Sequence, residues 1–149
     1  MNLPDPTTLA TLVSNVTQTM CGITFGVATP GQPAVNCWRM AVLDITGGSP
    51  WQVALFSDEP GCVALGAALF QVSPESLDSS MVEDSLCELL NMAAGQLKGL
   101  LAEDSALGLP KIRTPKELTP RSQAAMGAGV LLRSQDSVNL MILISEGLD

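Results

Sequence analysis

The hydrophobic and polar positions of this chain follow the helical period in two long segments. Hydrophobic residues recur at steps of three and four between Leu9 and Met20, which predicts an amphipathic helix that begins near Pro6 and ends at Gly22. The same period returns over residues 79–102, where it predicts a second and longer helix. Each helix therefore has one side that we expect to be buried.

Other apolar runs are short and rich in β-branched or aromatic residues, which is typical of strands. The strands that we expect are residues 23–28, 38–45, 51–56, 128–133 and 138–145. The sequence GGSP at 47–50 predicts a hairpin turn, and another turn is expected near Gln135. Ser57 and Asp58 are placed to cap a short helix that ends at Phe70.

The start of the longer helix and the segment after it are less regular. Ser79 or Ser80 is expected to cap this helix, with Glu83 in the position of a capping box. Residues 107–112 read as a short extended piece. Residues 113–121 hold two prolines and much of the positive charge of the chain. We expect them to form an exposed loop, whose basic side chains are either solvated or part of a docking patch.

The order of these elements favours an α+β fold, in which helices pack on a mostly antiparallel sheet. Strands and helices come in runs here, whereas alternating units would indicate a parallel sheet. The chain has 149 residues, a length that suits one domain with its own hydrophobic core. We therefore expect residues 1–149 to form a single domain.

Charge excludes several classes of partner. The formal net charge of −8 opposes binding to nucleic acid, which requires basic patches, and to an anionic membrane surface. No apolar run is long enough for a membrane span, and no signal peptide is recognisable, so we expect a cytoplasmic protein. Residues 6–38 contain no charged side chain. Such a stretch is expected to be buried, either in the core or in a subunit interface.

The types of residue present also limit the chemistry. The chain has four cysteines without paired spacing and no histidine. A metal site of its own is therefore not expected, and catalytic systems that use histidine as a base are excluded. In a reducing compartment the cysteines are expected to be small buried hydrophobic residues.

The long helix separates its residues into two stripes at about 100° per residue. The apolar stripe is expected to be buried and contains Leu86, Leu89, Ala93, Leu97 and Leu100. The opposite stripe contains Asp84, Glu88, Asn91 and Gly95. A glycine in a helix lowers its stability by about 1 kcal/mol relative to alanine. Gly95 therefore suggests close approach of another surface, either a partner or a helix of the same protein.

The triplet Asp84, Glu88 and Asn91 resembles the signature of the CheC/CheX/FliY phosphatases of bacterial chemotaxis. The resemblance extends to the rest of the helix, VEDSLCELLNMAAGQLKGLL, to the following LGLPKI and to the N-terminal segment LVSNVTQTMCGITF. CheC has two copies of the triplet, whereas this chain has one and is closer to CheX. Prolines stand at 110 and 115, on either side of the position that the family pattern often uses.

This resemblance implies a CheC/CheX-like fold and a phosphatase that acts on the aspartyl phosphate of a CheY-like receiver. It implies that Asn91 orients the attacking water and that Glu88 docks to the active-site lysine of the receiver. Glu88 as a general base is the alternative, although an exposed carboxylate is a weak base. Asp84, Gly95 and Lys98 would border the contact. Mg²⁺ would belong to the receiver, this chain would need no cofactor, and CheX-like proteins form homodimers.

Two other hypotheses remain open from the residues alone. The chain could be a non-catalytic interaction module of the same fold in chemotaxis or two-component signalling, as the altered proline spacing allows. It could also be an unrelated acidic α+β domain in which the triplet is a coincidence, because Glu and Asn on the outer side of a helix are usually just solvated. In that case Glu88 or Asn91 is expected to be buried and satisfied internally.

Overall fold

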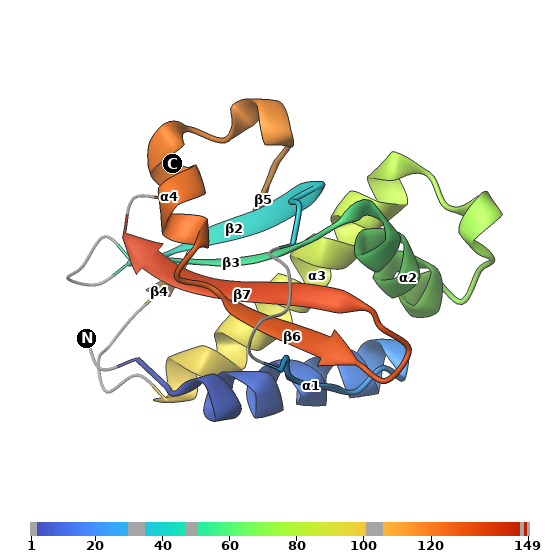
Figure 1. The fold of residues 1–149 in the computed structure, drawn as a ribbon, viewed down its shortest axis with the longest axis horizontal. Coiled ribbons are helices and arrows are strands. Elements are labelled where there is room, and N and C mark those ends of the chain that lie inside the picture. The colour runs from blue at the N-terminus through green and yellow to red at the C-terminus, as the bar shows by residue number, and fades with distance from the viewer. Residues whose placement is uncertain (1–2, 30–34, 47–50, 101–105, 147, 149) are drawn as a thin grey trace.

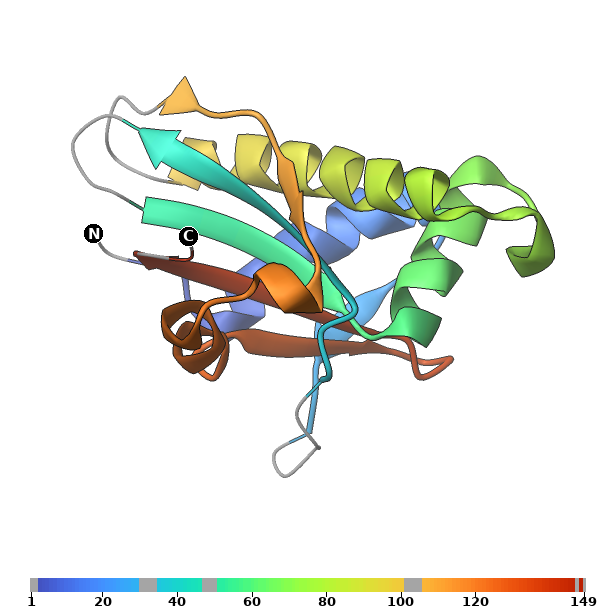
Figure 2. The ribbon, with the colours of Figure 1, turned by 90° about the horizontal axis from the view of Figure 1, so that it is seen from above.

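A computed structural model describes residues 3–29, 35–46, 51–100, 106–146 and 148 of the chain. One sheet forms the centre, with three helices on one face and a fourth, shorter helix on the other (Figures 1 and 2). The helices are α1 (Pro6–Cys21), α2 (Glu59–Phe70), α3 (Ser79–Leu100) and α4 (Pro120–Met126). The strands are β1 (Phe25–Val27), β2 (Arg39–Thr46), β3 (Trp51–Ser57), β4 (Ala106–Leu107), β5 (Lys111–Arg113), β6 (Val130–Ser134) and β7 (Asn139–Glu146).

The strands follow the order β1-β6-β7-β3-β2-β4, and β5 also pairs with β2. Every pairing among the described residues is antiparallel. The α+β class with an antiparallel sheet, expected from the order of elements, is therefore confirmed. The turn expected at 47–50 lies outside the described residues, but β2 and β3 do pair as the hairpin prediction requires.

Successive residues of β2 point to opposite faces of the sheet, as strand geometry dictates. Ala41, Leu43 and Ile45 join the larger apolar core, which lies between the sheet and helices α1, α2 and α3. Met40 and Val42 join a smaller core on the other face, beneath α4. The larger core fixes α3 against the sheet, and it thereby decides which side of α3 faces outward.

The predicted capping residues at the end of α1 and at the start of α2 are both confirmed. Gly22 closes α1 with φ 70°, a left-handed conformation that glycine adopts without a steric cost. The Asp58 carboxylate accepts a hydrogen bond from the Gly61 backbone N–H at 2.8 Å and caps α2. A second carboxylate oxygen of Asp58 accepts from the Asn139 amide at 3.2 Å, so this cap also ties α2 to the first residue of β7.

The cap of α3 differs from the prediction. The carboxylate of Asp78, not a serine hydroxyl, accepts the Met81 backbone N–H at 2.9 Å. Glu83 makes no capping box, because its carboxylate turns toward the sheet. Ser79 and Ser80 stand within the helix itself. Aspartate is as good a capping residue as serine, and local sequence does not separate the two options.

The segment expected to be one exposed loop contains ordered elements. Pro115–Glu117 is a turn of 3₁₀ helix (η2), and α4 begins at Pro120. Both prolines occupy a first helical turn, where the missing N–H of proline has no cost. Thr119 caps α4 by accepting the Ser122 backbone N–H at 3.0 Å. The prolines that suggested a loop therefore mark helix starts. A second 3₁₀ turn (η1) lies at Pro74–Ser76, before α3.

Candidate functional site

The polar stripe of α3 lies on the outer surface of the molecule. Its members are all exposed: Asp84, Glu88, Asn91 and Gly95, and Lys98 at its border is exposed as well. Behind it, the apolar stripe is almost fully buried, with exposed fractions of 1% or less at Leu86, Leu89, Ala93 and Leu97. The helical period thus correctly predicts which side of α3 faces the core. Leu100 is the exception, because 53% of this residue remains exposed.

Glu88 and Asn91 have no internal hydrogen-bond or ion-pair partner among the described residues. Both side chains project from the middle of a helix that is 22 residues long. This arrangement contradicts the hypothesis that the two residues are buried and satisfied within the protein. A carboxylate and a carboxamide therefore stand one turn apart, free to bind an external group.

Gly95 has open space in front of it. A Cβ atom added there would meet no heavy atom within 4 Å. The interpretation of Gly95 as a residue that allows packing between helices of the same protein is therefore wrong. Its missing side chain serves no contact with the described residues, and it leaves the backbone of α3 accessible from their side.

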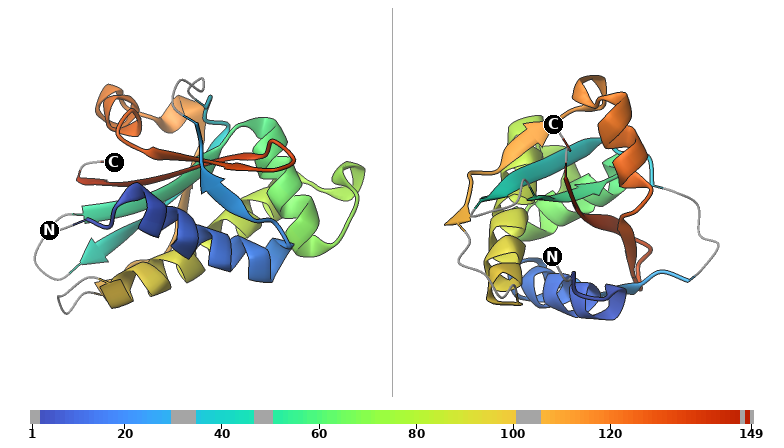
Figure 3. Two further views of the ribbon diagram at one scale, coloured as in Figure 1. Left: turned by 60° about the horizontal axis from the view of Figure 1, so that its bottom comes forward. Right: turned by 90° about the vertical axis from the view of Figure 1, so that its left-hand side faces the viewer.

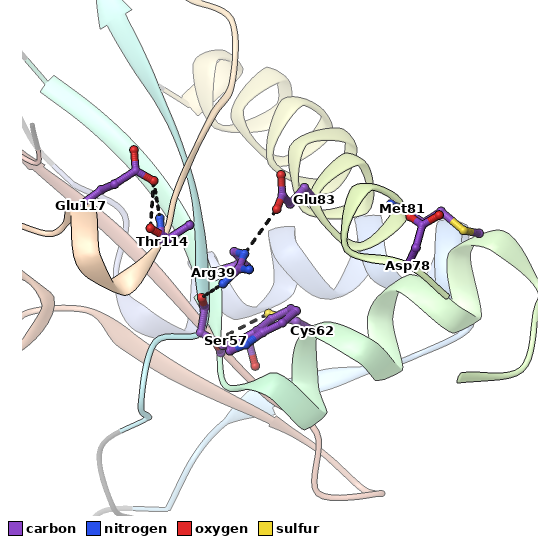
Figure 4. Close-up of polar contacts among 9 residues, drawn as sticks. Arg39, Ser57, Cys62, Asp78, Met81, Glu83, Thr114 and Glu117 are labelled. Atoms are coloured by element: carbon purple, nitrogen blue, oxygen red, sulfur yellow. Dashed lines mark hydrogen bonds and ion pairs between the residues drawn. The ribbon is translucent and has the colours of Figure 1, made fainter. Parts of the chain in front are cut away.

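An ion pair borders the stripe on the side that faces the sheet. Arg39, at the start of β2, places its Nε 3.3 Å from Oε2 of Glu83 (Figure 4). The guanidinium also lies 4.2 Å from the centre of the Trp38 ring, and its Nη1 donates to the Trp38 carbonyl at 2.8 Å. Arg39 is thus held from three directions, and it joins the early turns of α3 to the sheet.

The same guanidinium acts on a carboxylate beyond β5. Two hydrogen bonds from Thr114, one from its backbone N–H and one from its hydroxyl, lower the pKa of Glu117 (Figure 4). Arg113 and Arg39 lower the pKa of Glu117 further through their charges. These groups lie around the junction of β2, β5 and η2 and hold it through the Arg39–Glu83 ion pair and the Thr114–Glu117 hydrogen bonds.

Cys87 is the half-buried thiol of this face, one turn from both Glu83 and Asn91. Burial raises the pKa of the Cys87 thiol, and the nearby charges of Asp84 and Glu83 raise it further. A thiol of raised pKa stays protonated near neutral pH and is a poor nucleophile. Burial likewise raises the pKa of Cys21 and Cys37 to about 11 and that of Cys62 to about 12. None of these thiols is poised for catalysis.

No group of three or more His, Cys, Asp or Glu side chains among the described residues is arranged to hold a metal ion. None of the described helices has the length and apolar character needed to cross a membrane. The polar stripe of α3 is therefore the strongest candidate for a functional site in this part of the chain.

Known structures share this fold. The chain resembles a CheX crystal structure from Vibrio vulnificus, with 18% identity, a TM-score of 0.67, and coverage of 92% of this chain and 93% of that chain. The CheX–CheY–BeF3–Mg²⁺ complex from Borrelia burgdorferi matches with 14% identity, a TM-score of 0.69, and coverage of 92% and 94%. FliY from Thermotoga maritima matches with 13% identity, a TM-score of 0.59, and coverage of 99% and 93%. These identities are low, so the likeness shows the fold.

Comparison with curated protein sequences found no match. Comparison with sequence families matches residues 39–131 to the family described as chemotaxis phosphatase CheX. The matched region includes the whole of α3 and most of the sheet. This family match covers more than half of the chain, and the CheX-like fold places Glu88 and Asn91 on the outer surface. The chain belongs to the CheX family of chemotaxis phosphatases.

Proposed function

We propose that this protein accelerates hydrolysis of the aspartyl phosphate on a CheY-like receiver domain, with Asn91 orienting the attacking water. The observation that supports this most directly is the outward-facing, unpartnered pair of Glu88 and Asn91 on α3. Membership of the CheX family and the CheY bound in the Borrelia burgdorferi complex support the same class of partner.

The phosphatase needs to supply few groups for this reaction. Phosphoryl transfer is governed mainly by positioning and by electrostatic stabilisation, and the receiver would supply the phosphoryl group and its Mg²⁺. What remains is a water molecule aligned with the departing oxygen. The carboxamide of Asn91 can donate one hydrogen bond and accept another, so it can hold a water in one orientation. Such positioning lowers a barrier by several kcal/mol.

Glu88 would bind the receiver rather than activate the water. It lies one turn before Asn91 on the exposed side of α3, where it can reach a lysine of a docked receiver. An ion pair formed there would draw that lysine away from the phosphoryl group. Glu88 as general base is the alternative, and the two roles differ in which kinetic constant they affect.

The remaining residues of the stripe would define the edge of the contact. Asp84 and Lys98 are exposed at its two ends and would face charges on the rim of the receiver. Gly95 would admit the receiver close to the backbone of α3, as the open space in front of it allows. No cofactor is assigned to this chain, because the Mg²⁺ of the reaction would sit on the receiver.

We also propose that the protein forms a homodimer. Strand β1 pairs with β6 and with no other described strand, and 48% of Val27 is exposed. An unpaired strand edge is a natural place for a second copy to add its own strand. Sedimentation should give a dimer at micromolar concentration, and a monomer at high concentration would refute the proposal. The cytoplasmic location stays a prediction.

A non-catalytic interaction module is the second candidate function. It is favoured by the positions of Pro110 and Pro115, which differ from the family pattern and lie in the segment that follows α3. In this case phosphorylated receivers would bind the protein without losing phosphate faster.

A phosphate-release assay separates the two functions. Several receivers phosphorylated by acetyl phosphate would be mixed with the wild-type protein, with Asn91→Ala, and with Gln123→Ala as a control. Gln123 is an exposed carboxamide on α4, so the control removes the same chemical group from another surface. The proposal predicts faster release with the wild type and the control only.

A further inference from the structure

Leu109 is the most exposed large hydrophobic residue in the described part of the chain. It lies between β4 and β5, and 83% of it is exposed. The other exposed large hydrophobic residues range from 39% to 53%: Leu3, Val27, Phe70 and Leu100. Leu109 therefore adds almost nothing to the core of this domain. A single exposed leucine is common on protein surfaces, so its place in the fold decides whether it matters.

The backbone on both sides of Leu109 is held by β2. The Gly108 N–H donates to the Asp44 carbonyl at 2.8 Å, and β5 begins to pair with β2 two residues after Leu109. Pro110 follows directly, and a proline fixes its own φ and restricts the backbone of the residue before it. A side chain on such a backbone loses less conformational entropy on binding than one on a free loop.

Leu109 is level with the centre of the polar stripe along α3. Strand β2 and helix α3 run in the same direction (Figure 2), and the Arg39–Glu83 ion pair joins them near their starts. The hydrogen bond just before Leu109 meets β2 five residues after Arg39, about 16 Å further along the strand. The same distance from Glu83 covers about 11 residues of α3. It ends between Asn91 and Gly95.

The ion pair also shows which side of α3 faces the sheet edge. At about 100° per residue, Glu83 is about 80° around the helix from Asn91, and it faces β2 through Arg39. Ala94 is about 60° from Asn91 in the same direction, and only 1% of it is exposed. The neighbouring part of the protein therefore covers α3 up to this point. Glu88 is about 60° from Asn91 in the other direction, so Asn91 lies between Glu88 and the covered side.

The segment that contains Leu109 is part of this covered side. Both β4 and β5 pair with β2, and Cα atoms of β5 and α3 come within 8 Å of each other. The chain that joins β4 to β5 lies beside α3, on the side away from α1 (Figures 2 and 3). Leu109 thus stands at the sheet-side border of the polar stripe.

The stripe alone is too small for a stable contact. From Asp84 to Lys98 it is about 21 Å long and roughly 10 Å wide, or on the order of 200 Å². A specific interface buries about 800 Å² on each partner, which is a patch about 32 Å across. If such a patch is centred on Asn91, it includes the residues just before β5, because β5 itself approaches α3 within 8 Å.

Lysines flank Leu109 on both sides. Lys98 is exposed on the sheet side of the polar stripe, and Lys111 is exposed two residues after Leu109. Neither lysine forms an ion pair within the described residues. The nearby Asp44 carboxylate accepts a hydrogen bond from the Gln52 amide at 2.9 Å. The surface that complements this border is therefore an apolar patch with carboxylates around it.

We propose that Leu109 anchors the receiver by entering an apolar depression beside the phosphorylation site of the receiver. Lys98 and Lys111 would face carboxylates around that depression. This inference rests on the proposed function and extends it: α3 supplies the groups that act on the phosphate, and the segment between β4 and β5 supplies affinity and fixes the receiver across the helix. Leu109 is a binding residue in this arrangement, because it touches none of the reacting atoms.

The test compares two exposed leucines. Leu109→Ser and Leu100→Ser remove the same side chain, but Leu100 stands about 180° around α3 from Asn91. Leu109→Met keeps an apolar side chain of similar size, and Asn91→Ala is measured beside them. The measurements are binding of a receiver in its beryllium fluoride form, KM and kcat for the phosphorylated receiver, and sedimentation. Leu109 is 83% exposed, so its variants are expected to fold, and thermal unfolding checks this.

Leu109→Ser should weaken receiver binding and raise KM about tenfold or more, because burial of a leucine side chain contributes at least that much to affinity. Its kcat at saturating receiver should equal that of the wild type. Leu109→Met and Leu100→Ser should bind as the wild type does. Unchanged KM in Leu109→Ser would overturn the inference, as would an equal rise of KM in Leu100→Ser. A change in oligomeric state without a change in KM would also overturn it.

The outcomes also separate this inference from the proposed function. If no phosphorylated receiver loses phosphate faster with the wild type, or if Asn91→Ala stays fully active, the proposed function itself is wrong. If Asn91→Ala is inactive and Leu109→Ser binds the receiver normally, only the role of Leu109 is refuted.

Discussion

The Arg39 guanidinium and the Glu83 carboxylate form an ion pair across 44 positions of sequence, with 3.3 Å between Nε and Oε2. Only 18% of the Arg39 side chain is exposed, against 35% for Glu83. The pair joins the first strand of the central hairpin to α3 and borders the stripe that holds Asn91. It is a polar contact between the early turns of α3 and the sheet, and it adds to the packing of the apolar core.

Exchange of the two charges tests this relationship. Arg39→Glu and Glu83→Arg should each lower the free energy of unfolding by about 1 kcal/mol or less, because partly exposed ion pairs contribute little and are screened by solvent. The double variant should recover part of this loss. Urea unfolding of the four proteins gives the coupling between the residues. Additive losses would show that the two charges do not interact.

Removal of the Asn91 carboxamide should abolish stimulated dephosphorylation and leave the fold intact. Asn91 is exposed, so Asn91→Ala is expected to unfold at the same urea concentration as the wild type. Asn91→Asp should also be inactive, because an ionised carboxylate accepts hydrogen bonds but cannot donate one to the water. The measurement is phosphate release from a phosphorylated receiver. Wild-type rates in Asn91→Ala would count decisively against water positioning by this residue.

Substitution of Glu88 separates docking from general base catalysis. If Glu88 binds the receiver, Glu88→Gln should raise KM and leave kcat close to that of the wild type at saturating receiver. If Glu88 removes a proton from the water, kcat should fall by about 100-fold or more. Steady-state rates over a range of receiver concentrations distinguish the two. Asp84→Asn is the matched control on the same helix face, with a smaller expected effect on KM.

We expect the contact with the receiver, and not the stability of the fold, to require a small residue at Gly95. Gly95→Ala is expected to raise the free energy of unfolding by about 1 kcal/mol, because alanine favours a helix more than glycine does and the added Cβ has open space. Gly95→Trp should also fold, yet it should block the receiver and raise KM. Thermal unfolding and receiver binding are measured together. A tryptophan variant that binds the receiver normally would remove Gly95 from the docking surface.

The elements with strong local signals were predictable from the residues. The helical period identified α1 and the exposed side of α3, and the caps at Asp58 and Gly22 identified two helix ends. The α4 helix was missed, because its prolines are equally compatible with a loop and with a helix start. Strand β1 is shorter than expected, since the extent of a strand depends on the neighbour with which it pairs.

The candidate site was likewise predictable only in part from the sequence. The resemblance of the α3 motif to CheX identified Glu88 and Asn91, and periodicity alone sufficed to predict that they face outward. The position of Leu109 beside the stripe had no sequence signal, because its segment comes alongside α3 only when β4 and β5 pair with β2. The uncharged run over α1 was visible in the sequence, and the helical period predicted its buried side, but the structure was needed to show which of its polar residues are exposed.

By itself, the sequence determined the hydrophobic period of α1 and α3, the side of α3 that enters the core, and the family whose motif α3 resembles. Each of these depends on residues within a few turns of one another, where geometry is set by the backbone. Tertiary structure alone decided that Glu83 meets Arg39 and that α1 lies antiparallel beside α3. Those contacts join distant segments, and they arise only when burial of the shared core closes the chain around them.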